Sequence, residues 1–277
     1  MLYEDLNLAE KEIIKNTYYN NKTIKIEDLP ILLPFKVSIR TFKKVLKQDY
    51  SINTRLKNRY LINETYFDKI DCEEKAYILG LIASDGYVSD KNNEIILSSN
   101  DKEILIKIKD CLEYTGNIRV SKKGGFKNSK NGYILYFSSK KINKKLHELG
   151  FYSNKSLTFS YIPSQIPKEL RRHFLRGYFD GDGSITYYQR TYIIKEKSYT
   201  YNRMICSIIA TEKFINEIIQ EFELNKYSIT QSKTKELKYL NISAKNELKK
   251  FYHLMYDNSH IFMERKNIIW SKNIEGL

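Results

Sequence analysis

Two stretches of this sequence, 97 residues apart, follow the same pattern. The first is Glu-Lys-Ala-Tyr-Ile-Leu-Gly-Leu-Ile-Ala-Ser-Asp-Gly over residues 74–86, and the second is Arg-Arg-His-Phe-Leu-Arg-Gly-Tyr-Phe-Asp-Gly-Asp-Gly over residues 171–183. Gly80 aligns with Gly177, and Asp85 aligns with Asp182. A repeat of this length predicts that one supersecondary unit occurs twice and that the two copies fold into one monomeric body.

The segments after the two motifs also match in order. Each motif helix is followed by a β-hairpin, a helix, a second hairpin and a basic helix, and the order αββαββα therefore occurs twice. The expected later helices are 102–113 and 141–149 in the first copy, and 212–222 and 244–256 in the second. This order predicts an α+β fold of two pseudo-symmetric halves behind a small all-α N-terminal domain. The expected boundaries are 1–65, 66–164 and 165–277.

The first 65 residues differ in character from the rest. Helical periodicity covers residues 8–19, a proline-interrupted segment follows at 26–34, and Ser38 is placed to cap a helix that runs to about Gln48. Residues 36–59 contain eight basic residues and one acid. Three short helices with a basic third one resemble a helix-turn-helix module with a basic linker. The DNA contacts expected from this module are Arg40, Lys43, Lys44, Lys47, Arg55, Lys57 and Arg59.

The amino-acid composition indicates what kind of partner the protein binds. The chain has 47 Lys and Arg against 33 Asp and Glu, and a net charge of +14 favours a polyanion. No apolar run is long enough to span a membrane, and the acidic N-terminus does not resemble a signal peptide. The three cysteines form neither a disulfide framework nor a metal-site pattern. We expect a cytoplasmic, nucleoid-associated protein of an AT-rich phage or bacterial genome.

The repeated glycines predict a close helix contact. A glycine inside an apolar helix costs about 1 kcal/mol relative to alanine, so its presence at the same phase of both repeats needs a reason. The simplest reason is that the two motif helices cross at Gly80 and Gly177 with no side chain between their backbones.

The repeated aspartates predict a metal site. A carboxylate at a helix C-terminus faces the negative end of the helix dipole. If the two helices pack together, Asp85 and Asp182 come close, and like charges at that distance repel unless a cation lies between them. Carboxylates at a partly open site suit Mg²⁺, which completes its shell with waters and phosphate oxygens. A helix stop before a turn would explain the glycines that follow but not the aspartates.

The segments Leu79-Gly-Leu-Ile-Ala-Ser-Asp-Gly and Leu175-Arg-Gly-Tyr-Phe-Asp-Gly-Asp-Gly resemble the paired motifs of LAGLIDADG homing endonucleases, and the resemblance covers about residues 72–270. It implies a saddle of two four-stranded antiparallel sheets over DNA, with the motif helices between them. It also implies that Mg²⁺ or Mn²⁺ binds at Asp85 and Asp182, with the preceding Ser84 and Gly181 as further ligands. Ala83 replaces an acid that Asp180 retains, and we interpret that change as harmless because this acid is not the family's metal ligand.

The same resemblance implies further catalytic groups. Members of the family have a polar side chain after the first hairpin and a lysine beyond the last helix of each half. The matching residues are Asn100 and Lys155 in the first half, and Thr211 and Lys266 in the second, with Arg265 as a rival to Lys266.

The hairpin strands are expected to read DNA. A two-stranded ribbon fits the major groove, where Arg, Lys, Gln and Asn contact base edges. Residues 185–208 form such a ribbon, dense in Tyr and basic side chains. The expected contacts are Arg119, Lys122, Lys123, Lys127, Gln189, Arg190, Lys195, Lys197, Arg203 and Lys233.

These features predict a monomeric, metal-dependent endonuclease that cuts double-stranded DNA at a long, asymmetric target. Two alternatives use the same scaffold: a non-cleaving DNA-binding regulator and an intron RNA maturase. The acids retained in both motifs favour the endonuclease, because regulators of this kind tend to lose them.

Overall fold

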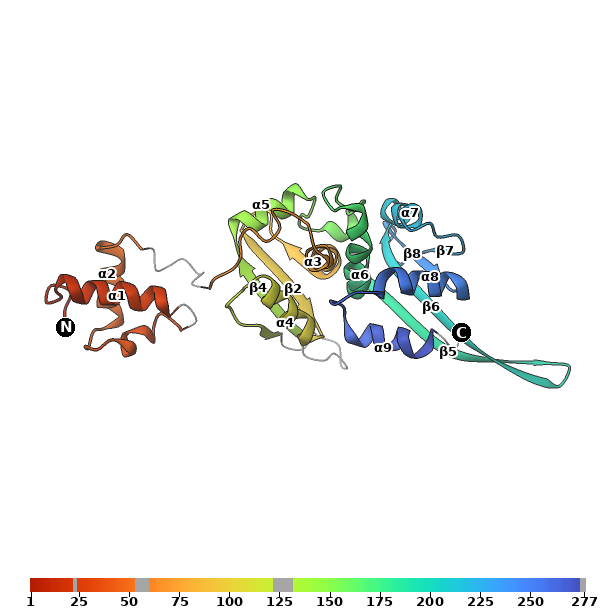
Figure 1. Ribbon diagram of the computed structural model, residues 1–277, viewed down its shortest axis with the longest axis horizontal. Helices are drawn as coiled ribbons and strands as arrows, with labels where there is room; N and C mark the ends of the chain where they lie inside the picture. The colour runs from red at the N-terminus through yellow and green to blue at the C-terminus, as the bar shows by residue number, and fades with distance from the viewer. Residues whose placement is uncertain (22–23, 53–59, 122–131, 275–277) are drawn as a thin grey trace. The chain divides into compact units, whose positions relative to one another are not determined.

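The computed structural model describes residues 1–21, 24–52, 60–121 and 132–274 (Figure 1). The chain forms two compact units. The first unit is Met1–Asn63 with Leu112–Asn117, and the second is Glu64–Cys111 with Ile118–Leu277. Within the described ranges, no helix combines the length and the apolar character that a membrane crossing requires.

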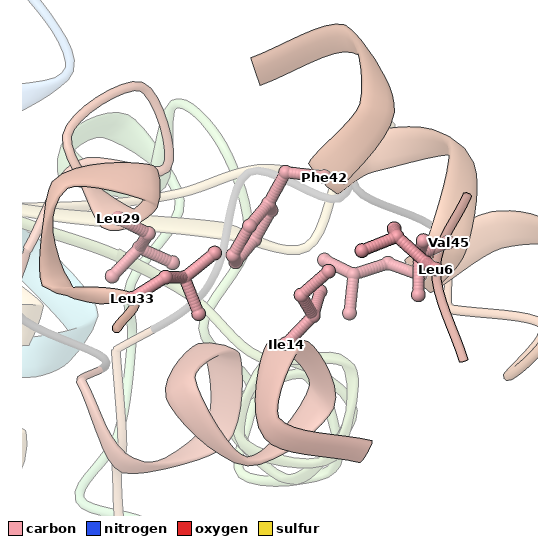
Figure 2. Close-up of a cluster of buried hydrophobic side chains, with 7 residues drawn as sticks. Leu6, Ile14, Leu29, Leu33, Phe42 and Val45 are labelled. Atoms are coloured by element: carbon pink, nitrogen blue, oxygen red, sulfur yellow. The ribbon is translucent and has the colours of Figure 1, made fainter. Parts of the chain in front are cut away.

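The first unit is helical, as predicted. It contains α1 (Leu8–Asn20), a 3-10 turn η1 (Leu29–Leu32) and α2 (Ile39–Gln48). Ser38 caps α2, because its hydroxyl accepts a hydrogen bond from the Thr41 amide at 3.1 Å. The apolar core that joins the three elements is shown in Figure 2 and consists of Leu6, Ile14, Leu29, Leu33, Phe42, Val45 and Leu46.

The second unit contains the repeat. Its first half is α3 (Glu73–Asp85), β1 (Gly86–Val88), β2 (Glu94–Ser99), α4 (Lys102–Cys111), β3 (Arg119–Ser121), β4 (Gly132–Ser138), α5 (Lys140–Glu148) and η2 (Lys155–Leu157). Its second half is η3 (Lys168–Leu170), α6 (Arg171–Asp182), β5 (Gly183–Ile194), β6 (Lys197–Thr211), α7 (Glu212–Glu221), β7 (Ser228–Gln231), β8 (Leu237–Ile242) and α8 (Lys245–Tyr256). The predicted order αββαββα is confirmed in both halves. A further helix, α9 (Glu264–Asn273), was not predicted.

Each half forms one four-stranded antiparallel sheet. The strand orders are β1-β2-β4-β3 and β5-β6-β8-β7, so the two sheets have the same topology. The predicted α+β fold of two pseudo-symmetric halves is therefore confirmed. Helices α3 and α6 lie side by side between the two sheets (Figure 1).

The two motif helices touch through their backbones. A Cβ atom added to Gly80 would lie 2.0 Å from the carbonyl oxygen of Phe174, and one added to Gly177 would lie 2.0 Å from that of Tyr77. The contact is reciprocal, and no side chain fits at either position. Both aspartates that end these helices are thereby brought to one place.

The first hairpin of the second half is much longer than that of the first half. Strands β5 and β6 pair from Gly183 to Ile194, whereas β8 pairs with β6 only over Cys206–Thr211. The rest of the hairpin is a two-stranded ribbon that extends past the sheet (Figure 1). Its turn is Lys195-Glu196, and both residues have positive φ, as a two-residue hairpin turn requires.

Candidate active site

The candidate site lies where α3 and α6 end. Asp85 and Asp182 are the last residues of these helices, and a glycine that begins a strand follows each of them. A Cβ atom added to Gly181 would lie 1.9 Å from Ser84 Oγ and 3.1 Å from Asp85 Oδ2. Gly181 of one helix is therefore in direct contact with Ser84 and Asp85 of the other, and a side chain there would collide with Ser84.

The two carboxylates lie near positive charges, those of Lys155 and Lys266 for both acids and that of Arg265 for Asp85. Asp85 is exposed and Asp182 partly exposed, and no other described residue gives either side chain a hydrogen bond or an ion pair. Although part of the residue is exposed, the atoms packed around the carboxyl of Asp85 raise its pKa, and the charges of Lys266, Arg265 and Lys155 oppose the rise. The pKa of Asp182 rises to about 6, first because of burial and second because of the negative charge on Asp85. The two acids therefore repel one another, as the sequence predicted for neighbouring carboxylates.

A buried lysine lies at the end of each motif helix. Lys155 Nζ donates a hydrogen bond to the carbonyl oxygen of Gly86, the C-cap of α3. Lys266 Nζ donates to the carbonyl oxygens of Phe179 and Gly183, both at 2.5 Å. A positive charge at these positions complements the negative end of the helix dipole.

Burial changes the acidity of both lysines. Their side chains are almost fully buried, at 5% and 4% exposed. Burial lowers the pKa of each to about 8, and nearby acids oppose the fall: Asp182 and Asp85 for Lys155, and Asp180 first for Lys266. Both amines can therefore exchange protons close to neutral pH.

The donor set fits a hard divalent cation. No group of three or more His, Cys, Asp or Glu side chains in the described parts of the chain could hold a metal ion. Two carboxylates alone leave most of a six-coordinate shell to backbone carbonyls, waters and phosphate oxygens, which is how Mg²⁺ is usually bound. The Ser84 hydroxyl donates to the Leu81 carbonyl at 3.1 Å and keeps its oxygen lone pairs, while the Gly181 carbonyl accepts from Lys266 Nζ at 3.4 Å.

Of the other expected catalytic groups in the described structure, Arg265 lies near the acids, since its charge lowers the pKa of Asp85, whereas Asn100 and Thr211 do not contact them. Asn100 is exposed just past the end of β2, and no contact within the described structure joins it to Asp85 or Asp182. Thr211 caps α7 and donates to the Phe159 carbonyl at 2.6 Å, a structural arrangement. Arg265 is exposed, whereas its neighbour Lys266 is buried against the helix end.

Sequence reasoning missed a buried polar network beside the site. Asp180 is wholly buried and accepts hydrogen bonds from Tyr77 Oη at 2.8 Å, Tyr256 Oη at 2.9 Å and the Met263 amide at 2.7 Å. Arg176, one turn earlier on α6, is also wholly buried. The signal available in the sequence was the pair of charged residues, Arg176 and Asp180, within the mostly apolar run 174–180.

The register of β5 and β6 gives the ribbon two different faces. Residues directly opposite one another share a face. The face that continues the core side of the sheet is uncharged, with Gln189 opposite Asn202 and Thr191 opposite Thr200. The other face is aromatic and cationic, and its opposed pairs are Tyr188–Arg203, Arg190–Tyr201 and Tyr192–Tyr199.

The remaining predicted DNA contacts of the second unit are at its surface or outside the described residues. Arg119 is exposed and its guanidinium lies 4.9 Å from the ring centre of Tyr136. Lys195 and Lys197 are exposed at the ribbon turn, and Lys233 is exposed between β7 and β8. Lys122, Lys123 and Lys127 lie outside the described residues.

The basic helix of the first unit is partly neutralised. Lys43 forms an ion pair with Glu27 at 3.1 Å, and Lys44 pairs with Glu4 at 2.8 Å. Arg40 and Lys47 are exposed. The other three expected contacts, Arg55, Lys57 and Arg59, lie outside the part of the chain that the structure describes.

Known proteins are similar to the repeated part of the chain. The sequence profile of a family described as "LAGLIDADG-like domain" matches residues 73–150 and 169–255. The structure of the I-LtrWI LAGLIDADG homing endonuclease bound to target DNA is similar in fold, with a TM-score of 0.51 and 14% sequence identity over 73% of this chain and 90% of that chain. I-GzeII in complex with its DNA target has a TM-score of 0.49 and 12% identity over 72% of this chain and 89% of that chain. I-SmaMI bound to uncleaveable DNA has a TM-score of 0.48 and 13% identity, again over 72% and 89%. Comparison with curated proteins gave no match.

Proposed function

Because the chain belongs to the LAGLIDADG-like domain family, we propose that it is a homing endonuclease that cuts both strands of a specific DNA target and depends on a divalent metal. The observation that carries the proposal is the pair of carboxylates, Asp85 and Asp182, at the matched ends of two helices in backbone contact. The charges of Lys155 and Lys266 offset the repulsion between the two acids only in part, since the pKa of Asp182 still rises to about 6, and a bound cation would offset it further.

Asp85 and Asp182 would hold the metal, together with the backbone carbonyls of Ser84 and Gly181. When bound, Mg²⁺ activates water and offsets the charge that develops at the phosphate. The chain's own residues provide the geometry. The close helix contact fixes the spacing of the two acids, and the glycine at position 181 lets Ser84 and Asp85 pack directly against the end of α6.

Lys155 and Lys266 would each serve one strand. Each Nζ is held at the end of one motif helix by backbone carbonyls, so its position is fixed before DNA binds. With a pKa of about 8, each amine is mostly charged at neutral pH and can stabilise a phosphate, while a sizeable fraction is neutral and can accept a proton. Two such sites in one chain give one cut in each strand without a second subunit.

The aromatic and cationic face of the ribbon is the proposed DNA surface. Arg190 and Arg203 lie on it with four tyrosines in the opposed pairs, and a net charge of +14 supports phosphate binding. The structure of I-LtrWI contains bound target DNA, which supports DNA as the partner.

The test is cleavage of a randomised plasmid library with Mg²⁺, beside a Ca²⁺ control, followed by sequencing of the ends. We expect recurrent ends at one long motif with Mg²⁺ and few with Ca²⁺. Asp85→Asn and Asp182→Asn should abolish double-strand cleavage but retain DNA binding, whereas Asp68→Asn, at a surface ion pair with Lys141, should cut like the parent. Retention of DNA without ends would identify a non-cleaving DNA-binding protein instead, and preference for structured RNA would identify a maturase.

A further inference from the structure

Helix α6 holds the chain that leads from α8 to α9 with two buried side chains. Arg176 Nη1 donates to the Met255 carbonyl at 2.6 Å, and Arg176 Nε donates to the Ile261 carbonyl at 2.9 Å. Four residues later on the same face, Asp180 accepts from the Met263 amide at 2.7 Å. These contacts connect α6 to the end of α8 and to the residue that precedes α9.

The contact with Met263 continues to Lys266. Met263 is the N-cap of α9, and its carbonyl accepts from the Lys266 amide at 3.0 Å. The Lys266 side chain then returns to α6, where Nζ donates to the carbonyls of Phe179 and Gly183. These four hydrogen bonds form a connected path that starts at the Asp180 side chain, passes through Met263 and Lys266, and returns to the α6 backbone at Phe179 and Gly183.

The first half reaches the same position without this device. The residues that align with Arg176 and Asp180 are Leu79 and Ala83, both apolar. Lys155 lies on the short turn η2, where Asn154 has a positive φ and the Lys155 carbonyl accepts from the amides of residues 158 and 159. At this motif position, a buried carboxylate therefore occurs only in the half whose lysine, Lys266, lies on a separate helix, α9.

We propose that Asp180 is a positioning residue that fixes the start of α9, so that Lys266 reaches the end of α6. The proposal rests on the proposed function for its effect on cleavage, and on the hydrogen bonds above for its effect on α9. The proposal gives Asp180 a specific role. The first half has Ala83 at the matching position and does not need the acid, because Lys155 is held in another way.

The test compares Asp180→Asn with Lys266→Met and with a matched control, Glu217→Gln. Glu217 is also a partly buried acid of the second half, and it accepts from the Ile162 amide at 2.9 Å on a helix that does not carry Lys266. The first measurement is amide hydrogen exchange of the peptide spanning 261–267. Asparagine replaces the charged acceptor by a neutral one and offers a single oxygen to the three donors that Asp180 accepts, so exchange at Met263 should speed by about tenfold or more in Asp180→Asn. Lys266→Met and Glu217→Gln should leave this amide protected.

The second measurement is strand-specific cleavage of a plasmid that carries the recovered target. Asp180→Asn should accumulate nicked circles with the nick in the same strand as Lys266→Met, and the double variant should be no slower than Lys266→Met alone, because the two residues act in series. Equal slowing of both strands, or unchanged exchange at Met263, would overturn the proposal. If Asp180→Asn does not fold, Tyr256→Phe removes one donor from the same carboxylate and should show both effects to a smaller, several-fold degree.

The two measurements test the proposed function and the positioning role of Asp180 separately. A parent protein that does not cut DNA refutes the proposed function. The exchange experiment on the same protein still decides whether Asp180 holds the start of α9.

Discussion

Replacing Asp182 by asparagine should make the metal-free protein more stable at neutral pH. The pKa of this carboxyl rises from 3.8 to about 6 in the folded chain, first through burial and then through the charge on Asp85. Folding therefore opposes the charged form of Asp182, and a neutral amide of the same shape removes the penalty. One pKa unit corresponds to about 1.4 kcal/mol, so the shift represents at most about 3 kcal/mol. Since the side chain is partly exposed, screening by water should reduce the gain to about 1–2 kcal/mol.

The pH dependence has a defined sign. An acid with a raised pKa binds a proton more strongly in the folded state, so the parent's free energy of unfolding falls as the pH rises from about 4 to about 6. The advantage of Asp182→Asn should consequently be small near pH 4 and complete at pH 7.

Urea denaturation in the presence of a chelator, at several values between about pH 4 and 7.5, measures this difference. Adding Mg²⁺ should then stabilise the parent more than the variant, because the metal binds the folded site. Asp68→Asn controls for the loss of one surface carboxylate. A variant that is no more stable than the parent at pH 7, or whose advantage is the same at pH 4, would refute the idea that the site stores carboxylate repulsion.

Three further outcomes are expected. Gly80→Ala should lower the free energy of unfolding by about 3 kcal/mol or more in denaturant melts, because the new methyl group would lie 2.0 Å from a carbonyl oxygen, and an unchanged midpoint would contradict the close contact. Arg190→Ala should weaken DNA binding in a filter or anisotropy titration and reduce the salt slope by about 1, whereas Gln189→Ala on the opposite face should not change the slope. Arg40→Ala should likewise weaken binding more than Lys44→Ala, because Lys44 is already paired with an acid, and equal effects would show that this ion pair opens on DNA.

The sequence was sufficient to predict the repeat and much of its consequence. Each half has the expected αββαββα order. The matching positions of Gly80 and Gly177 predicted a close contact between the two motif helices, and the backbone distances confirm it. These features depend on local periodicity and on matching positions within the chain, which a single sequence contains. The catalytic roles of Asp85, Asp182, Lys155 and Lys266 stay predictions.

Two features needed the three-dimensional structure. Helix α9 was missed because its ten residues are mostly polar, and it is held mainly by Lys266 and Trp270, which are buried against α6 and its surroundings. The Asp180 network was missed because its partners, Tyr77 and Tyr256, lie 103 and 76 residues away in the sequence. In the first unit, the expected middle helix is only a 3-10 turn of four residues, with Pro30 at its second position.

The hydrogen bond from Tyr77 to Asp180 makes the two halves unequal partners. Tyr77 belongs to the first half, and the residue that aligns with it in the second half is Phe174. If two copies of the second half were joined as a symmetric dimer, each buried Asp180 would face a phenylalanine and lose a donor, at a cost of about 1–3 kcal/mol per site. Separately expressed halves should therefore recombine as a first half with a second half and not as pairs of second halves. A single buried hydroxyl thus encodes pairing selectivity, and it offers a starting point for a split enzyme whose two chains recognise each other.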